Sequence, residues 1–146
     1  MNIVERPVKD SDMEFLWTLQ KETMQYYVEA IWGWNEDDQR KRFLDKFKTD
    51  NRKILECDGK SIGLWHIETH PDHIFLASIL IQPSYQNRGV GTAKISELIK
   101  EADKCKIPIR LQVLLGNPAV NFYKRLGFSE YTRSDTHRHL IWDFTT

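Results

Sequence analysis

The stretch from Phe75 to Ala102 constrains the fold of this chain more than any other. It opens with a run of apolar residues typical of a buried strand, and Pro83 ends that run. A polar turn follows, and Gly89-Val90-Gly91 then opens a segment with apolar residues at helical spacing. A strand, a glycine turn and a helix start direct free backbone N–H groups and the positive end of the helix dipole to one point. Such a point favours an anion, most often a phosphate.

The glycine turn allows several phosphate-binding interpretations. A dinucleotide-binding turn, G-x-G-x-x-G, is incomplete because Lys94 occupies the third glycine position. The P-loop pattern G-x-x-x-x-G-K-[ST] is also incomplete, because Gly59-Lys60-Ser61 has Ile54 at the position of the first glycine. The remaining pattern, Gln86-x-x-Gly89-x-Gly91, resembles the Q/R-x-x-G-x-G/A motif of the GNAT superfamily of N-acetyltransferases. The motif is short, so an ordinary strand-to-helix turn stays open as an alternative on this pattern alone.

A second segment, from Asn117 to Phe128, strengthens the resemblance. It looks like the GNAT pattern N-x-A-x-x-[FL]-Y-x-x-L-G-F. Its own pattern predicts a short helix, with Asn117 as the cap, Pro118 at the first position and Gly127 after the last turn. Together the two segments place the resemblance over residues 75–128, roughly the C-terminal half of the chain.

The resemblance implies an α/β (α+β) fold of the GNAT type. This fold is a mixed, mostly antiparallel seven-stranded sheet flanked by about four helices, and its central strands splay apart to form the acetyl-CoA cleft. The chain's patterns predict strands and helices in the order β-α-α-β-β-β-α-β-α-β-β, with an Asp58-Gly59 hairpin turn after the second strand. The expected strands are residues 2–6, 53–57, 61–69, 74–82, 109–114, 128–133 and 137–144, and the first two helices reach about residues 31 and 48.

Composition narrows the class of protein. The 146 residues suit a single domain, 1–146, and 21 basic residues balance 21 acidic ones, without the basic stripe expected of a nucleic-acid-binding protein. The two cysteines, Cys57 and Cys105, have no metal-site spacing and predict a reduced, cytoplasmic protein. The N-terminal residues lack the apolar run of a signal peptide, and no apolar stretch is long enough to cross a membrane. The resemblance adds a possible homodimer through exposed edge strands.

The resemblance also implies which residues bind acetyl-CoA, the acyl donor. Backbone N–H groups of the turn and helix start would hold the pyrophosphate, and the central strand would bind the pantetheine arm and receive the oxyanion. Asn117 is placed like the family's residue that touches the pantetheine arm, and Tyr123 matches a tyrosine that commonly donates a proton to the CoA thiolate. The structural alternative for Tyr123 is a core aromatic residue. The cofactor-binding residues implied in this way are Ile79, Leu80, Ile81, Gln86, Asn87, Arg88, Gly89, Val90, Gly91, Thr92 and Asn117.

The general base is not evident in the sequence. Some relatives have a glutamate early in the central strand, where this chain has Phe75, and others have one on the next strand, where it has Gln112. Neither side chain accepts a proton. A water chain to bulk solvent is one substitute. The side chains that remain as candidates are His66, Glu68, Glu22, Glu29 and His137.

The segment between the first two predicted helices is rich in aromatic residues, and in this family it usually shapes the acceptor site. Tyr27, Trp32 and Trp34 are therefore candidates for an aromatic wall around the acceptor amine, with Glu68 as a further substrate candidate. The alternative is that the tryptophans cover the end of the core. Acidic residues nearby, Glu29 and residues 36–38, favour a cationic substrate.

Histidine spacing suggests metal sites, but the sequence favours none. His66, His70 and His73 straddle a predicted turn and would face different ways, so surface histidines are the expected outcome. His137 and His139 share a strand face and lack a third ligand.

Three functions follow from the resemblance. The first is an acetyl-CoA-dependent N-acetyltransferase for a primary amine of a small molecule or peptide. The second is acetylation of a protein N-terminus or lysine. The third, of another class, is a CoA-binding module without catalysis, which the missing carboxylates at Phe75 and Gln112 would suit and the presence of Tyr123 would not.

Overall fold

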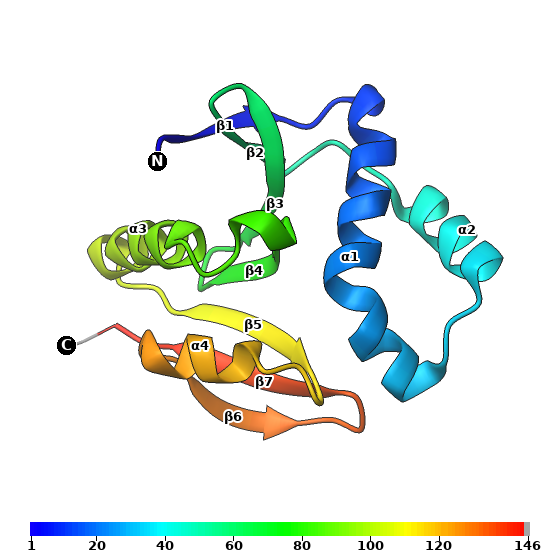
Figure 1. Ribbon diagram of the computed structural model, residues 1–146. Coiled ribbons are helices and arrows are strands. Elements are labelled where there is room, and N and C mark those ends of the chain that lie inside the picture. Colours follow the sequence, from blue (N-terminus) through cyan, green and yellow to red (C-terminus); the bar gives the residue numbers. More distant parts are fainter. Residues whose placement is uncertain (145–146) are drawn as a thin grey trace. The chain divides into compact units, whose positions relative to one another are not determined.

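The computed structural model describes residues 1–144, and Figure 1 shows their helices and strands. Seven strands form one sheet in the order β1-β2-β3-β4-β5-β7-β6. The β4–β5 pair is parallel, whereas β1–β2, β2–β3, β5–β7 and β6–β7 are antiparallel. This confirms the predicted GNAT-type sheet and helix order, while the acetyl-CoA cleft stays a prediction. The elements are β1 (Ile3–Pro7), α1 (Met13–Trp32), α2 (Glu36–Lys46), β2 (Arg52–Cys57), β3 (Lys60–Thr69), β4 (Ile74–Ile81), α3 (Val90–Cys105), β5 (Ile109–Leu114), α4 (Ala119–Arg125), β6 (Ser129–Arg133) and β7 (His137–Trp142), with 3-10 turns η1 (Asp10–Asp12) and η2 (Pro83–Tyr85).

Most predicted elements are confirmed to within two residues, and the differences have local causes. Pro7, expected to end β1, is its last residue and lies opposite Lys53, a position that proline tolerates on an edge strand. Helix α2 ends at Lys46 because Phe47 is extended, with ψ of 127°. Helix α4 begins at Ala119, one residue later than expected.

The Asp58-Gly59 hairpin between β2 and β3 is confirmed. Both residues have positive φ, 52° and 78°, as a type I′ turn requires. The strands on either side are antiparallel, with Cys57 opposite Lys60, and the register shifts between Leu55 and Glu56.

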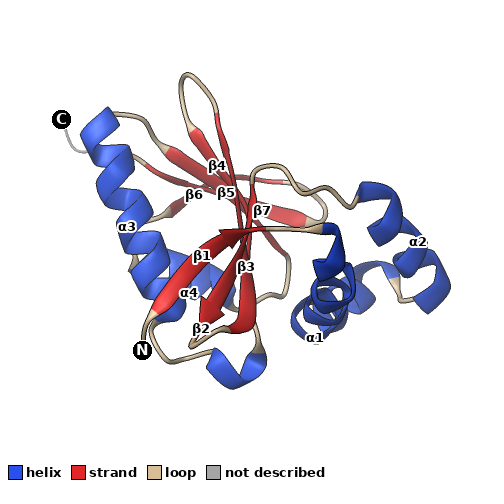
Figure 2. Cartoon of the chain, turned by 90° about the horizontal axis from the view of Figure 1, so that it is seen from above, coloured by secondary structure: helices blue, strands red, loops and turns tan. Residues whose placement is uncertain are grey.

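Contacts divide the chain into two compact units. The first contains residues 1–66 and 78–88, and the second contains residues 67–77 and the chain from residue 89 onward. Strands β3 and β4 therefore contribute residues to both units. Figure 2 draws the strands of the chain in red and the helices in blue.

The core of the first unit joins α1 to β2. Val8, Leu16, Leu19 and Ile54 form a buried cluster. Trp17 of α1 packs 5.4 Å, between ring centroids, from Phe43 of α2, so the two helices lie side by side (Figure 1). Partly buried apolar side chains complete this core, namely Phe15, Phe43, Phe47, Leu64 and Leu80.

A network of charged side chains connects the residue just before α1 to strands β1 and β2. Arg6 donates two hydrogen bonds to Asp12, of 2.8 and 2.7 Å, and a third of 2.8 Å to Glu56. Asp12 also accepts a 2.8 Å bond from the Lys9 backbone N–H. The hydrogen bonds from Arg6 hold the pKa of Asp12 below its usual value. The ionised carboxylate therefore stabilises this end of the unit.

The second unit follows the predicted amphipathic pattern. Val90, Ile95, Leu98 and Ala102 are buried along one face of α3. In β5 the odd-numbered residues from Ile109 are buried and the even-numbered residues Arg110 and Gln112 are exposed, the alternation of a strand with one covered face.

Candidate functional site

The start of helix α3 has the geometry of an anion-binding turn. Gly89 has φ of 87°, a left-handed conformation that glycine adopts without strain, and helix α3 follows it directly. The Ala93 N–H donates to the Gly89 carbonyl over 3.0 Å, which begins the helical hydrogen bonding. The N–H groups of Val90, Gly91 and Thr92 precede that bond and are therefore available to a ligand. With the helix dipole, they favour an anion at this point.

The two motifs that carry the family resemblance meet inside the second unit. A Cβ added at Gly91 would lie 3.3 Å from Cζ of Phe122 in α4, closer than most Cβ contacts allow. Gly91 therefore lets α4 approach the glycine turn closely. This contact brings the glycine turn before α3 together with the Asn117–Phe128 segment. Sequence spacing alone does not establish that the two are in contact.

Residues just before the turn, in the first unit, form contacts with one another and with the end of β4. The Gln86 side-chain amide donates 3.0 Å to the carbonyl of Ile81, the last residue of β4. The Arg88 guanidinium lies 5.0 Å from the Tyr85 ring centroid and remains exposed. Asn87 has φ of 60°. Gln86 thus closes the turn onto the end of β4, and its role toward CoA stays a prediction.

Gly63 in β3 is a residue that sequence reasoning missed. A Cβ at this position would lie only 2.5 Å from the backbone oxygen of Leu80 and 3.2 Å from Cδ1 of Ile81. Leu80 and Ile81 belong to the strand segment predicted to bind the pantetheine arm. An isolated glycine inside a strand pattern often marks a close approach of another backbone, and this signal was present in the sequence.

Asn117 precedes the first residue of α4 by two positions, and Tyr123 lies within the helix. Asn117 Oδ1 accepts a 2.9 Å bond from the Ala119 N–H, so the side chain caps this helix as predicted. Tyr123 packs edge-on against Phe122 and Phe128, with ring centroids 5.3 and 5.7 Å away. Burial raises the pKa of Tyr123 to about 12, so its hydroxyl keeps its proton at neutral pH.

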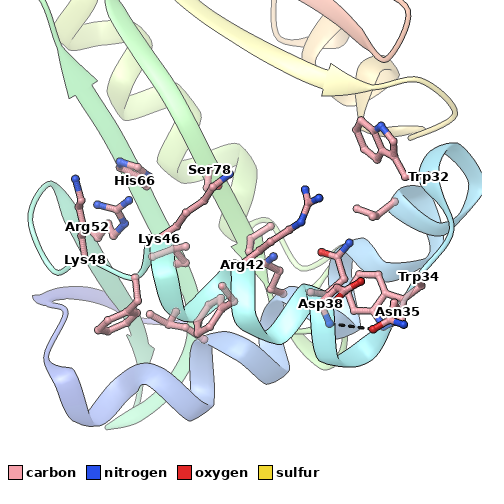
Figure 3. Close-up of a pocket in the computed structure, with 18 of the residues that line it drawn as sticks. Trp32, Trp34, Asn35, Asp38, Arg42, Lys46, Lys48, Arg52, His66 and Ser78 are labelled. Carbon is pink, nitrogen blue, oxygen red and sulfur yellow. Dashed lines mark hydrogen bonds between the residues drawn. The ribbon is translucent and has the colours of Figure 1, made fainter.

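The first unit contains a pocket of about 730 Å³, shown in Figure 3. Trp32 and Trp34, two of the predicted substrate residues, line it together with Leu80 of the central strand. Tyr27 is outside the lining and packs edge-on against Tyr26. Glu68 belongs to the second unit, where its carboxylate lies 3.7 Å from His70 Nε2. Apolar side chains form part of the pocket wall, namely Leu16, Val28, Phe43, Phe47 and Leu64.

Basic side chains dominate the charge of this pocket. Its lining contains Arg42, Lys46, Lys48 and Arg52 and a single carboxylate, Asp38. Glu36, expected to favour a cationic substrate, instead binds Lys21 at 3.0 Å and accepts a 2.8 Å bond from Trp34 Nε1. The Trp34 bond and then the Lys21 bond lower the pKa of Glu36. The acidic residues near the tryptophans therefore contribute little negative charge to the pocket.

Among the candidate bases, His66 is the one that lines the pocket, in the company of Ser78 (Figure 3). It lies opposite Arg52 in the β2–β3 register. Glu22 and Glu29 are exposed on α1 and outside the lining. In the second unit, His137 is 2.7 Å from Thr136 Oγ1, and burial followed by the charge of His139 lowers its pKa.

The remaining histidines form no cluster typical of a metal centre. The His70 and His73 rings stack with centroids 4.5 Å apart, and Asp72 lies 2.8 Å from His73 Nδ1. Within residues 1–144, no group of three or more His, Cys, Asp or Glu side chains is arranged to bind a metal ion. In the same range, no helix combines the length and apolarity that crossing a membrane requires.

Comparisons with known proteins agree with this geometry. A model of the acetyltransferase (GNAT) family matches residues 13–128. An uncharacterized N-acetyltransferase of Methanocaldococcus jannaschii is 32% identical over 98 residues, which cover 61% of this chain and 43% of that protein. The chain therefore spans less than half the length of that relative. The [ribosomal protein bS18]-alanine N-acetyltransferase of Escherichia coli is 29% identical over 116 residues, covering 73% of this chain and 74% of the enzyme.

Solved structures show the same fold at low sequence identity. The PaiA N-acetyltransferase of Thermoplasma acidophilum, in complex with coenzyme A, superposes with a TM-score of 0.79 at 18% identity, covering 99% of this chain and 100% of that one. The E. coli ribosomal-protein-S18-alanine N-acetyltransferase superposes with a TM-score of 0.69 at 19% identity, covering 99% and 96%.

Proposed function

The chain belongs to the acetyltransferase (GNAT) family, and from this premise we propose that it transfers the acetyl group of acetyl-CoA to a primary amine of a small molecule or peptide. The observation that carries the proposal is the contact of Gly91 with Phe122, which unites the anion-binding turn with the Tyr123 helix. Either motif alone is compatible with an ordinary turn or helix. Their packing against each other in one unit is what acetyl-CoA binding would require.

The residues present fit acetyl-CoA. The N–H groups of Val90, Gly91 and Thr92 suit the charge of the pyrophosphate, and no side chain at Gly89 or Gly91 obstructs its approach. In the first unit, the backbone of Ile79, Leu80 and Ile81 would bind the pantetheine arm. The side-chain amide nitrogen of Asn117 would be available to the ligand, since its oxygen caps α4.

The acceptor amine attacks the thioester carbonyl, an N–C bond forms and the C–S bond breaks. An alkyl ammonium, of pKa near ~10, must first lose a proton to expose its lone pair. We assign proton acceptance to His66, since it lines the pocket together with Leu80, a residue of the segment proposed to bind the pantetheine arm. An imidazole accepts a proton readily near neutral pH.

Tyr123 would stabilise the leaving thiolate by donating a hydrogen bond. A phenol with a pKa of about 12 is a weaker acid than a thiol with a pKa of about 8.5. Complete proton transfer to the thiolate would therefore cost about 5 kcal/mol, at about 1.36 kcal/mol per pKa unit. Hydrogen-bond donation avoids that cost while still stabilising the charge on sulfur.

A protein N-terminus is the second candidate acceptor. It is favoured by the E. coli relative, whose name assigns it to an alanine of ribosomal protein bS18. An N-terminal amine needs the same chemistry as a free amine, so the acceptor panel must contain both kinds.

The test measures release of the CoA thiol from acetyl-CoA across amines, polyamines, amino acids and peptides, with Tyr123→Phe and His66→Gln alongside. Amine-dependent release that falls in both variants supports the enzyme and both roles. Unchanged release in one variant removes that residue from the mechanism. If acetyl-CoA binds, as followed by calorimetry, but no amine causes release, the protein is a CoA-binding module and the transferase proposal is wrong.

A further inference from the structure

The pocket in the first unit has an excess of positive charge that the acetyl-transfer chemistry does not use. We propose that the acceptor is an anionic amine, one with carboxylates close to the reacting amine, such as an acidic amino acid or a peptide whose first residues are acidic. This inference rests on the proposed function, because it assigns the pocket to the acceptor. It names a substrate class that the resemblance leaves open.

The basic residues lie on α2, on β2 and on the segment between them, and all four line one pocket. Arg42 and Lys46 are four residues apart on α2, which places them on the same face of that helix. Lys48 follows the helix, and Arg52 begins β2. Figure 3 shows all four around the pocket, together with His66 and Ser78.

Most of these cations have no carboxylate partner. Within residues 1–144, the side chains of Arg42, Lys46 and Lys48 make no ion pair or hydrogen bond. Arg52 donates 2.9 Å to the Asp50 backbone carbonyl, and its nearest carboxylate, that of Asp50, is 3.7 Å away.

Two basic residues of these helices that lie outside the pocket lining have carboxylate partners. Arg40, on the same helix, binds Glu14 of α1, and Lys21 binds Glu36. Arg40 and Lys21 therefore have carboxylate partners within the protein, whereas Arg42, Lys46 and Lys48 of the pocket lining are available to a ligand. An anionic ligand would supply the missing partners, and Arg42 and Arg52 can bind a carboxylate with two parallel hydrogen bonds.

The same charges help the reaction. A cation near an ammonium disfavours the charged form and so lowers the pKa of the acceptor amine. Carboxylates on the acceptor would hold it against the basic residues, while its amine loses a proton more readily than in water. A purely cationic acceptor, such as a polyamine, would meet four basic side chains and only Asp38 as a partner.

The size of the pocket agrees with a short acceptor. Its volume of about 730 Å³ lies within the ~300–1,000 Å³ range of small-ligand sites. Trp32 and Trp34 add an aromatic wall beside the charged groups, and such a surface contacts the apolar parts of an amino acid or short peptide.

The test compares three peptides that differ only at their second and third residues. They begin Ala-Glu-Glu, Ala-Gln-Gln and Ala-Lys-Lys, share the same neutral remainder and end in an amide. We expect kcat/KM for the acidic peptide to exceed that for the neutral one by about tenfold to a hundredfold, the range that hydrogen bonds to charged groups supply. Free glutamate against glutamine forms a second arm, which distinguishes an amino acid from a peptide as the source of the carboxylates.

The variant Arg42→Gln/Lys46→Gln should reduce the acidic-to-neutral ratio by about tenfold. The control Lys41→Gln/Lys53→Gln removes the same two charges from exposed positions outside the pocket and should leave the ratio unchanged. A charge reversal, Arg42→Glu/Lys46→Glu, should move the preference toward the basic peptide. If both double neutralisations lower the ratio equally, general attraction explains the preference and the pocket assignment is wrong.

Binding of an unreactive product separates this proposal from the transferase proposal. The acetylated acidic peptide, measured by calorimetry with CoA present, should bind the protein and should lose affinity in Arg42→Gln/Lys46→Gln. Turnover of neutral and acidic peptides at equal rates would overturn the anionic acceptor and keep the transferase. Binding of the acetylated acidic peptide without turnover of any amine would overturn the transferase and keep the anion-selective pocket. Absence of that binding would overturn the anionic acceptor.

Discussion

Gly63→Ala tests whether the close approach of β3 to β4 contributes to the stability of the protein and to its affinity for CoA. The added Cβ would lie 2.5 Å from the Leu80 carbonyl oxygen, and an ordinary contact begins at 3.4 Å, so the strands must open by about 0.9 Å. The atom it meets is backbone and has no rotamer to change. We expect a loss of roughly 1–3 kcal/mol in the free energy of unfolding, the usual cost of overpacking. Because Leu80 belongs to the segment predicted to bind the pantetheine arm, affinity for CoA should also fall.

The assay combines urea unfolding, followed by circular dichroism, with calorimetric titration of CoA. Thr69→Ala, at the exposed end of the same strand, controls for the lower strand preference of alanine. Adding Ile81→Val to Gly63→Ala relieves the 3.2 Å side-chain contact but not the backbone contact, so it should restore little stability. Unfolding within ~0.5 kcal/mol of the unaltered protein, with the same affinity for CoA, would refute the reasoning.

Three further predictions follow from other contacts. Asp12→Asn, which removes the charged partner of Arg6, should cost about 1.5–3 kcal/mol near neutral pH. Because the folded pKa of Asp12 is lowered, its contribution is present above the unfolded value of about 3.9 and is lost as pH falls through the folded pKa, so unfolding curves of the two proteins should converge in acid. Tyr123, whose pKa is raised to about 12, contributes stability that is present below the unfolded value of about 10 and is lost as pH rises toward 12, so Tyr123→Phe should show a weaker alkaline decline in thermal melts. Gly91→Ala should change stability little, since better helix preference opposes crowding against Phe122, whereas Gly91→Ala/Phe122→Leu should make the Gly91→Ala step more favourable by about 0.5–1 kcal/mol in a double-mutant cycle of urea unfolding.

Much of the fold could be predicted because its signals are local. The apolar face of α3, the Asp58-Gly59 turn and the alternation in β5 each follow from residues a few positions apart. The cap at Asn117 was likewise predictable, since the accepting side chain and the donating N–H are two residues apart. Element ends were less certain, because the extended Phe47 that ends α2 has no distinctive sequence signal.

The pocket could not be predicted because its charges come together only in three dimensions. Arg42 and Lys46 look like part of any solvated helix surface, and their pocket face depends on how α2 packs on α1. Arg52 meets His66 only through the β2–β3 register, which the bulge at residues 55 and 56 shifts. The sequence-based preference for a cationic substrate counted Glu36 as a pocket charge, and Lys21 and Trp34 bind that carboxylate instead. The sequence around Glu36, Lys21 and Trp34 contains no pattern that predicts these two bonds.

The Gly91–Phe122 contact also favours one evolutionary order of substitutions at positions 91 and 122. A side chain at position 91 fits the helix backbone, whose φ there is not left-handed, but it meets the ring of Phe122 at 3.3 Å. A lineage that first shortens the side chain at position 122 gains freedom at position 91, whereas one that first enlarges position 91 must shift the Phe122 ring by a few tenths of an ångström. Mutational paths toward a tighter or looser CoA turn are therefore expected to pass through position 122 first.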